Sequence, residues 1–300
     1  MHPRISSTDH FILPLEYQLE RGRNLHQHSK STNNELKTIL LLVLMMSVAA
    51  ITIAQNSSDS MQQKEGGAAA DDPSQFLTRV ELYNELQHYK KNNLYLNQTI
   101  LRTVVKVGKR FTTRIDIPLI YNSLSTPAGY NQFGIGDISF RLLGYKLMEN
   151  PKSALTASIE ISLNTAESPL LGTGKNIILP VISYSRLIPE NKIVLALVLQ
   201  QANSIGGDEE RSKISFTKIQ AIVLKIWKPK MWTVLAPEWY IDYANGGLSM
   251  NLKGRFTTAP KRRINIWATA GAGIFGDFVG RYQWMGDIGA RYFLLRKNTN

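Results

Sequence analysis

The chain has no cysteine among its 300 residues. This absence excludes a disulfide framework and any metal site built from thiolates. It is compatible with the cytosol, and it equally suits an exported bacterial protein that stays unfolded in an oxidising periplasm. Cysteine usage therefore leaves the compartment open.

Histidine is scarce and unevenly placed, which limits the catalytic chemistry on offer. Four of the five histidines lie within the first 28 residues, and His88 is the only one after them. A serine–histidine hydrolase needs a histidine as general base, so such an enzyme would depend on His88 alone. The segment Gly172–Lys175 departs from a phosphate-binding loop, with Pro169 and Asn176 at two required positions. We therefore expect no enzyme, no cofactor and no metal.

Acidic residues are outnumbered, and the formal net charge is +12. Residues 1–70 carry equal numbers of basic and acidic side chains, so the whole excess follows them. The basic residues are spread singly, without a basic helix or nucleic-acid motif, which argues against nucleic acid as a partner. Lipopolysaccharide, phosphate headgroups and anionic solutes are the expected acidic neighbours.

Long hydrophobic runs are absent except at 38–54, which follows Lys37 and ends in small residues, Thr52 and Ala54. A basic residue, an apolar stretch and small residues before a cleavage point are typical of a secretory signal. The alternative is a retained signal anchor, although the run is short for a membrane span. We divide the chain into a non-native or polar extension (1–36), a signal peptide (37–54), a flexible mature N-terminus (55–75), a barrel (76–295) and a tail (296–300).

From residue 76 onward, short segments alternate apolar and polar residues with a period of two. The pattern indicates strands whose two faces meet different surroundings. One segment, 192–204, is apolar on both faces, and the first segment has a short helix as its alternative. The expected strands are 76–88, 94–107, 111–121, 136–148, 154–166, 176–188, 192–204, 213–227, 231–244, 248–258, 263–275 and 284–295.

The connections between these segments alternate in length, the even ones being short and most odd ones long. Outer-membrane barrels combine short periplasmic turns with longer external loops. We therefore predict an all-β fold, an antiparallel up-and-down transmembrane β-barrel of about twelve strands, exported to the outer membrane. Aromatic residues near strand ends are expected to form the interfacial girdles, namely Tyr121, Tyr130, Trp227, Trp232, Trp239, Tyr243, Trp284 and Tyr292.

Charged residues at alternate positions are expected to point into the barrel, where each needs a partner or water. They would form an internal salt-bridge lattice, a lining that selects solutes, or both. Asp137 is interpreted first as part of a strand-entry device with Gly134 and Gly136. The lumen-lining candidates are Arg79, Glu81, Arg102, Arg114, Asp116, Asp137, Arg141, Glu160, Glu238, Asp242, Lys253, Arg255, Asp287 and Arg291.

Four segments resemble one family of outer-membrane barrels. They are TRVELYNELQ (78–87), RIDIPLIY (114–121), FGIGDISFRL (133–142) and GDIGARYF (286–293). Over residues 75–295 the chain looks like the "MetA pathway of phenol degradation" transporters, which are described as channels or transporters for hydrophobic or aromatic compounds. The chain departs from a common barrel ending, because Phe293 is followed by LLRKNTN.

The function we predict is an outer-membrane channel or transporter for small solutes, hydrophobic or aromatic ones being what the resemblance implies. The alternatives are a structural or assembly barrel with a plugged lumen and a barrel lipid hydrolase. The expected partners are outer-membrane lipids, lipopolysaccharide, a small-molecule solute and the barrel assembly machinery during biogenesis.

The signal segment generates a direct prediction. Cleavage after Ala54 leaves a mature protein that begins at or near Gln55, because the small residues Thr52 and Ala54 precede that bond. N-terminal sequencing of protein isolated from membranes checks this. Residues 1–54 still attached would refute the cleaved signal.

Overall fold

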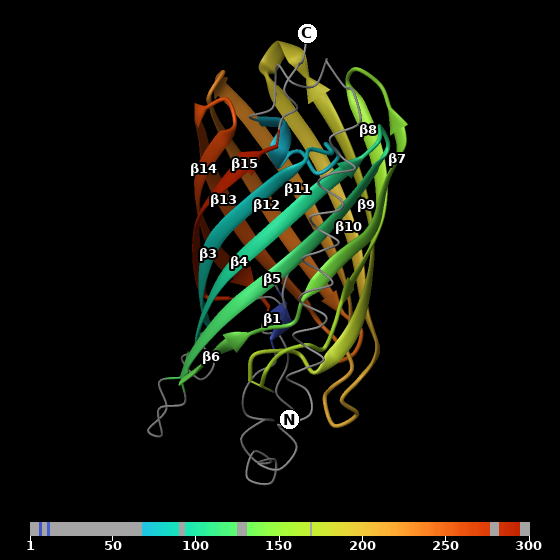
Figure 1. The fold of residues 1–300 in the computed structure, drawn as a ribbon, viewed down its shortest axis with the longest axis vertical. Helices are drawn as coiled ribbons and strands as arrows, with labels where there is room; N and C mark the ends of the chain where they lie inside the picture. Colours follow the sequence, from blue (N-terminus) through green and yellow to red (C-terminus); the bar gives the residue numbers. More distant parts are fainter. Residues whose placement is uncertain are drawn as a thin grey trace.

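The barrel is formed by one antiparallel sheet that closes on itself (Figure 1). The computed structural model describes residues 6–7, 11–12, 68–89, 94–124, 131–168, 170–276 and 282–294. The strands pair in chain order except that β6 and β7 both pair with β5, and β3 pairs with both β15 and β4. The result is a closed barrel with twelve strand positions, as the alternating sequence pattern predicted.

The strand bounds follow the alternating segments closely. The barrel consists of β3 (Arg79–Tyr89), β4 (Leu94–Val107), β5 (Phe111–Leu124), β6 (Asn131–Ile135), β7 (Ser139–Glu149), β8 (Ser153–Ser162), β9 (Lys175–Ile188), β10 (Ile193–Gly207), β11 (Ser215–Lys228), β12 (Met231–Asp242), β13 (Leu248–Lys261), β14 (Ile264–Phe275) and β15 (Trp284–Phe293). The elements that are not part of the barrel sheet are the pair β1 (Ser6–Ser7) and β2 (Phe11–Ile12) and the 3-10 turns η2 (Ala68–Asp71) and η4 (Pro189–Asn191).

One strand position is shared by two short strands. We predicted a single strand over 136–148, but β6 and β7 both pair with β5 and residues 136–138 lie between them. A Cβ on Gly134 would lie 2.7 Å from the side chain of Leu171, and one on Gly136 would lie 3.0 Å from the carbonyl oxygen of Leu171. These glycines therefore permit close approach of the connection after β8, which packs against this break.

The two faces of the strands differ as expected for a transmembrane barrel. On β8, Thr156, Glu160 and Ser162 are buried in the lumen, whereas Ile159 is exposed on the outer surface. The first segment is a strand, and the helix alternative is wrong. A slip of one residue would exchange the two faces, so the register of each strand is strongly specified.

The segment 192–204, whose sequence is apolar on both faces, corresponds to β10. On β10, Leu195, Leu197 and Leu199 are exposed on the outer surface, while Val194 and Ala196 are buried inside. These inward residues join apolar clusters with side chains of β11 and β12, including Ile222, Leu224 and Ala236. The inward residues of β10 are therefore part of an apolar patch on the inner wall of the barrel.

The connections separate by length between the two ends of the barrel (Figure 1). The end with the connections after β5, β8, β10 and β14 is called the long-loop end, and the opposite one the short-turn end. No helix in the described part of the chain is long and apolar enough to cross a membrane. The segments 1–5, 13–67 and 295–300, with the expected signal peptide and tail, lie outside the described residues.

Most of the expected girdle aromatics lie on the outer surface. Trp227, Tyr243, Trp284, Tyr292 and Tyr121 are exposed near strand ends, and Trp239 is partly buried. Trp232 was expected there as well, but this prediction is wrong. It is fully buried inside the short-turn end, because its indole N–H has a carboxylate partner in the lumen. Tyr130 lies outside the described residues.

The outer apolar surface generates a depth-dependent prediction. Leu197 and Ile205 share the outer face of β10, but Ile205 lies near the long-loop end, beyond the hydrogen-bonded polar pair Asn203 and Ser215. In lipid, an arginine near mid-depth costs about 2–4 kcal/mol, and near the interface about 0–1 kcal/mol. Leu197→Arg should therefore destabilise the barrel more than Ile205→Arg in denaturant titrations in lipid vesicles. Equal losses would contradict the membrane placement.

Candidate functional site

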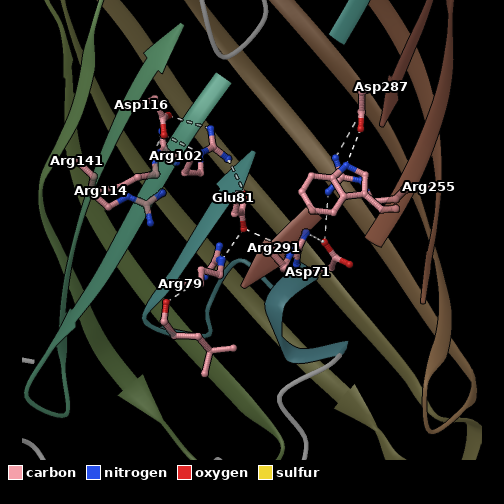
Figure 2. Close-up of polar contacts among 12 residues, drawn as sticks. Asp71, Arg79, Glu81, Arg102, Arg114, Asp116, Arg141, Arg255, Asp287 and Arg291 are labelled. Atoms are coloured by element: carbon pink, nitrogen blue, oxygen red, sulfur yellow. Dashed lines mark hydrogen bonds and ion pairs between the residues drawn. The ribbon is translucent and has the colours of Figure 1, made fainter. Parts of the chain in front are cut away.

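Charged side chains from neighbouring strands form a continuous lattice inside the barrel (Figure 2). Arg102 Nε and Nη2 donate to the two carboxylate oxygens of Asp116 at 2.7 and 2.9 Å. Arg114 lies 3.1 Å from Asp116 and 2.7 Å from Glu160, and Arg141 donates to Glu160 at 2.7 Å. Opposite charges thus alternate across β4, β5, β7 and β8.

Glu81 on β3 connects this row of charges to Arg291 on the neighbouring strand β15. Its carboxylate lies 2.6 Å from Arg79, 3.5 Å from Arg291 and 4.0 Å from Arg102. The guanidinium of Arg291 stacks over the ring of Trp267, 4.6 Å from its centroid. One carboxylate therefore serves three arginines.

Two further carboxylates complete the lattice on β12 and β15. Glu238 lies 3.3 Å from Lys218 and 3.2 Å from Lys253. Asp287 lies 3.6 Å from Arg255 and accepts a 2.6 Å hydrogen bond from the indole of Trp267. All are largely buried, and this pairing offsets the cost of removing their charges from bulk water.

A segment preceding the first barrel strand lies inside the lumen. We call residues 68–76 the inner strap. Asp71, at the end of η2, accepts hydrogen bonds from Arg291 at 2.9 Å, Arg255 at 3.3 Å, Trp232 at 2.6 Å and Thr257 at 3.2 Å. Its carboxylate thereby joins the strap to β12, β13 and β15 (Figure 2).

Further contacts along the strap reach the opposite wall. The hydroxyls of Ser74 and Ser185 on β9 lie 2.6 Å apart. The ammonium of Lys146 on β7 lies 5.5 Å from the ring centroid of Phe76. We expected residues 55–75 to be flexible. Of these, residues 68–75 are held by contacts across the lumen, and residues 55–67 lie outside the described residues.

The protonation of Asp71 controls the main strap contact. Burial alone would raise its pKa, but the charges of Arg291 and Arg255 and the hydrogen bond from Trp232 hold the pKa below its ordinary value of 3.8. A depressed pKa means that the carboxylate stabilises docking fully above pH 3.8 and loses this effect as the pH falls through the lowered pKa. The strap is therefore held at neutral pH.

The long-loop end is narrowed by the connection over 163–174. Leu171 is buried in an apolar cluster with Tyr89, Leu96 and Tyr282. Asp137 accepts hydrogen bonds from the backbone N–H groups of Thr165, Ala166 and Thr173 and from the hydroxyl of Thr173. This loop is thus folded inward and fixed by the carboxylate at the β6–β7 break.

Two adjoining cavities remain between the strap and this loop. The strap-side cavity, about 230 Å³, is lined by arginines of β3, β4, β5, β7 and β15 together with residues of the strap. The loop-side cavity, about 210 Å³, is lined by Glu85, Glu238 and Lys253 and by the apolar Ile100, Ile222 and Ala236. They share Arg102, Arg255, Lys218, Glu81, Asp71 and Gln220.

The structure brings most of the predicted lumen residues into these linings. Arg79, Glu81, Arg102, Arg114, Arg141, Glu160, Glu238, Lys253, Arg255, Asp287 and Arg291 line one cavity or both, and Asp116 lies directly behind Arg102 and Arg114. Asp137 and Asp242 line neither. Asp242 caps the turn after β12, where it accepts hydrogen bonds from the backbone of Ala244 and Asn245. Whether any of these residues contacts a solute stays a prediction.

Sequence reasoning missed three important members of the site. Lys218 and Gln220 alternate with outward residues on β11, and counting by two from Phe216 identifies them. Asp71 carries no such signal, because it precedes the first strand and only the folded barrel brings it to Arg291.

Comparisons with solved structures place the fold among outer-membrane channels and porins. An outer-membrane channel from Pseudomonas putida F1 matches with a TM-score of 0.60 and 14% identity, covering 74% of this chain and 98% of that one. The NanC porin matches at 0.50 with 9% identity, covering 72% and 100% of the two chains. The KdgM porin in complex with disordered oligogalacturonate also matches at 0.50, with 8% identity and coverages of 72% and 99%.

These similarities establish the fold, a closed antiparallel β-barrel like those of outer-membrane channels and porins, at identities too low to transfer a role or a substrate. No protein-family model matches the sequence, and no curated protein matches it significantly. The solved structures named above are channels and porins, none of them an enzyme.

The Asp71 contacts generate a prediction about the strap. Because the chain has no cysteine, Ala70→Cys introduces a single reporter at a buried strap position. Adding Asp71→Asn removes a buried carboxylate partner, a loss on the order of 3–5 kcal/mol, so thiol labelling should accelerate about tenfold or more.

Asp287→Asn serves as the matched control for this experiment. It removes a carboxylate from the same Arg255, but the contacts of Asp287 are with Arg255 and Trp267 of the barrel wall and not with the described residues of the strap. Labelling that accelerates equally with Asp287→Asn would show a general loosening of the barrel, and the proposed role of Asp71 would be wrong.

Proposed function

We propose that the protein is an outer-membrane channel that passes small solutes through its lumen. The observation that supports this best is the contrast between the two faces of one closed wall. The outer face is apolar at mid-depth, and the inner face carries a charged lattice around two cavities. A polar lumen inside an apolar outer surface is the arrangement of a water-filled transmembrane path.

The solute class follows from the two kinds of inner wall. Ile222, Val234 and Ala236 form an apolar patch in the lining of the loop-side cavity, beside its charged residues. A solute with apolar surface can contact this wall without losing water from polar groups. This supports the hydrophobic or aromatic solutes that the resemblance to the phenol-degradation transporters implies, and membership of that family belongs to the same proposal.

The alternative function is a plugged structural or assembly barrel. It is favoured by the inner strap and the loop over 163–174, which occupy the lumen from opposite ends. Under this alternative the two cavities are enclosed water sites. The strap's contacts with β12, β13 and β15 rest on the one carboxylate of Asp71, and this makes a removable obstruction the simpler interpretation.

A lipid hydrolase is disfavoured by the surroundings of His88. His88 is buried, and its imidazole packs between two rings, with centroids 4.5 Å from Tyr95 and 5.6 Å from Trp284. Aromatic neighbours of this kind mark an interfacial belt rather than a serine–histidine pair.

Localisation and partners complete the proposal. A secretory signal over 37–54 would export the chain, the barrel assembly machinery would insert it, and outer-membrane lipids and lipopolysaccharide would surround it. Exposed basic residues such as Arg110 and Lys109 in the first short turn suit contact with phosphate headgroups.

The channel function predicts that obstruction inside the lumen reduces ion flow. Ala236 is buried and lines the loop-side cavity, whereas its neighbour Leu235 is 49% exposed on the outer surface. Ala236→Trp should lower single-channel conductance in planar bilayers at least severalfold, because an indole fills much of the cavity. Leu235→Trp is the matched control and should conduct like the unmodified protein.

The same recordings separate the channel from the plugged barrel. If neither the unmodified protein nor Asp71→Asn conducts above the bilayer background, the plugged barrel is correct. If Leu235→Trp and Ala236→Trp reduce conductance equally, the path does not run through this lumen.

A further inference from the structure

We infer that the strap-side cavity binds a small organic anion with a compact apolar body, such as an aromatic carboxylate. The inference rests on the proposed channel function, because it names the solute class that this part of the lumen recognises. It is carried by the charges, an unpaired donor, the opposite wall and the size of the cavity.

The first observation is an excess of cations over carboxylates in the lining. Seven cations line this cavity, against four carboxylates: they are Arg79, Arg102, Arg114, Arg141, Arg255, Arg291 and Lys218, and Asp71, Asp72, Glu81 and Glu160. Glu160 is shared by two arginines, Glu81 by three and Asp71 by two, and Asp116, behind the lining, pairs with Arg102 and Arg114. Shared carboxylates leave guanidinium groups with unused donors, since each guanidinium carries five N–H groups.

The second observation is a buried donor without an acceptor. Nη1 of Arg291 is buried and forms no hydrogen bond to any described residue. Arg291 itself is only 3% exposed, because Trp267 covers one face of its guanidinium. A buried unsatisfied donor is costly, and a carboxylate bound in the cavity would supply the missing acceptor.

The third observation is an apolar wall across from the arginines. In a closed barrel of twelve strand positions, β10 lies half-way round from β3, and β9 from β15. Val181 of β9 and Val198 of β10 line the cavity on that side, and Phe76 of the strap adds a ring. A purely inorganic anion would leave this wall unused, and a neutral ring would leave the guanidinium groups unused.

The size of the cavity is consistent with a single small ring. Its volume is about 230 Å³, whereas an apolar cavity of about 150 Å³ is large enough to bind benzene. A ring that carries one carboxylate therefore fits, with the carboxylate toward the arginines and the ring toward Val181 and Val198.

Isothermal titration calorimetry on the refolded full chain tests the inference with three probes: benzoate, acetate and benzyl alcohol. Benzoate should bind at least tenfold more tightly than either of the others, because only benzoate satisfies both walls. Three equal dissociation constants, or no heat with benzoate, would overturn the proposal.

Two substitutions assign the binding to this cavity. Arg141→Gln leaves Glu160 paired with Arg114, and it should raise the dissociation constant for benzoate about tenfold. The matched control is Arg186→Gln, an exposed residue on the outer face of β9, which should change nothing. Equal effects of the two would overturn the assignment.

A second variant tests the apolar wall without altering any charge. Val198→Thr keeps the shape of the side chain and adds a hydroxyl, so it should reduce the preference for benzoate over acetate severalfold. An unchanged preference would contradict the assigned orientation of the ring. Val198→Thr also keeps the proposal testable if Arg141→Gln fails to fold.

The outcomes are separable from those for the channel itself. A barrel that conducts but shows no preference for benzoate retains the proposed function and loses this inference. A barrel that binds benzoate but does not conduct retains the site and loses the channel.

Discussion

The fold depends on a single constraint, which is that every charge on the inner face of the barrel must find a partner in a narrow space. A charge removed from bulk water costs several kcal/mol unless it is paired and hydrogen-bonded. Asp116, Glu160 and Glu81 meet this requirement by bridging arginines on adjacent strands. The bridges also specify which strands lie side by side, because a shift of one residue would move an entire row of charges into lipid.

The same constraint explains why the lumen is divided. Most of the carboxylates and cations lie on β3–β8 and β13–β15, whereas β10–β12 contribute an apolar patch of Val194, Ala196, Ile222 and Ala236 beside the single ion pair of Lys218 and Glu238. An apolar wall needs no partners, so it faces the charged side at no electrostatic cost. The resulting lumen is amphipathic.

The inner strap adds a condition to this arrangement. Asp71 provides a carboxylate to Arg255 and Arg291, which otherwise rely on Asp287 and Glu81. The strap is therefore part of the charge balance as well as an obstruction. The position of the strap in the lumen is therefore coupled to one ionisable group, the carboxylate of Asp71.

The alternation of residues carried most of the prediction from sequence. A period of two identified twelve strand positions and the inward charges such as Arg102 and Lys253, because lipid and lumen impose opposite polarity on successive residues. It could not find Asp71, whose position depends on tertiary contacts, nor the β6–β7 break, which depends on the packing of Leu171 against Gly134. It also placed Trp232 outside, since an aromatic residue near a strand end is compatible with either face until its partner is known.

The central claim is that successive residues of one strand meet lipid and lumen in turn, and β10 tests it most directly because both of its faces are apolar. Single cysteines at 194–200, each carrying a spin label in lipid vesicles, can be compared for collision with oxygen and with a water-soluble nickel complex. The account predicts a period of two, with oxygen collisions highest at 195, 197 and 199 and lowest at 196 and 198. Uniform oxygen access along the strand, or maxima at the even positions, would contradict it.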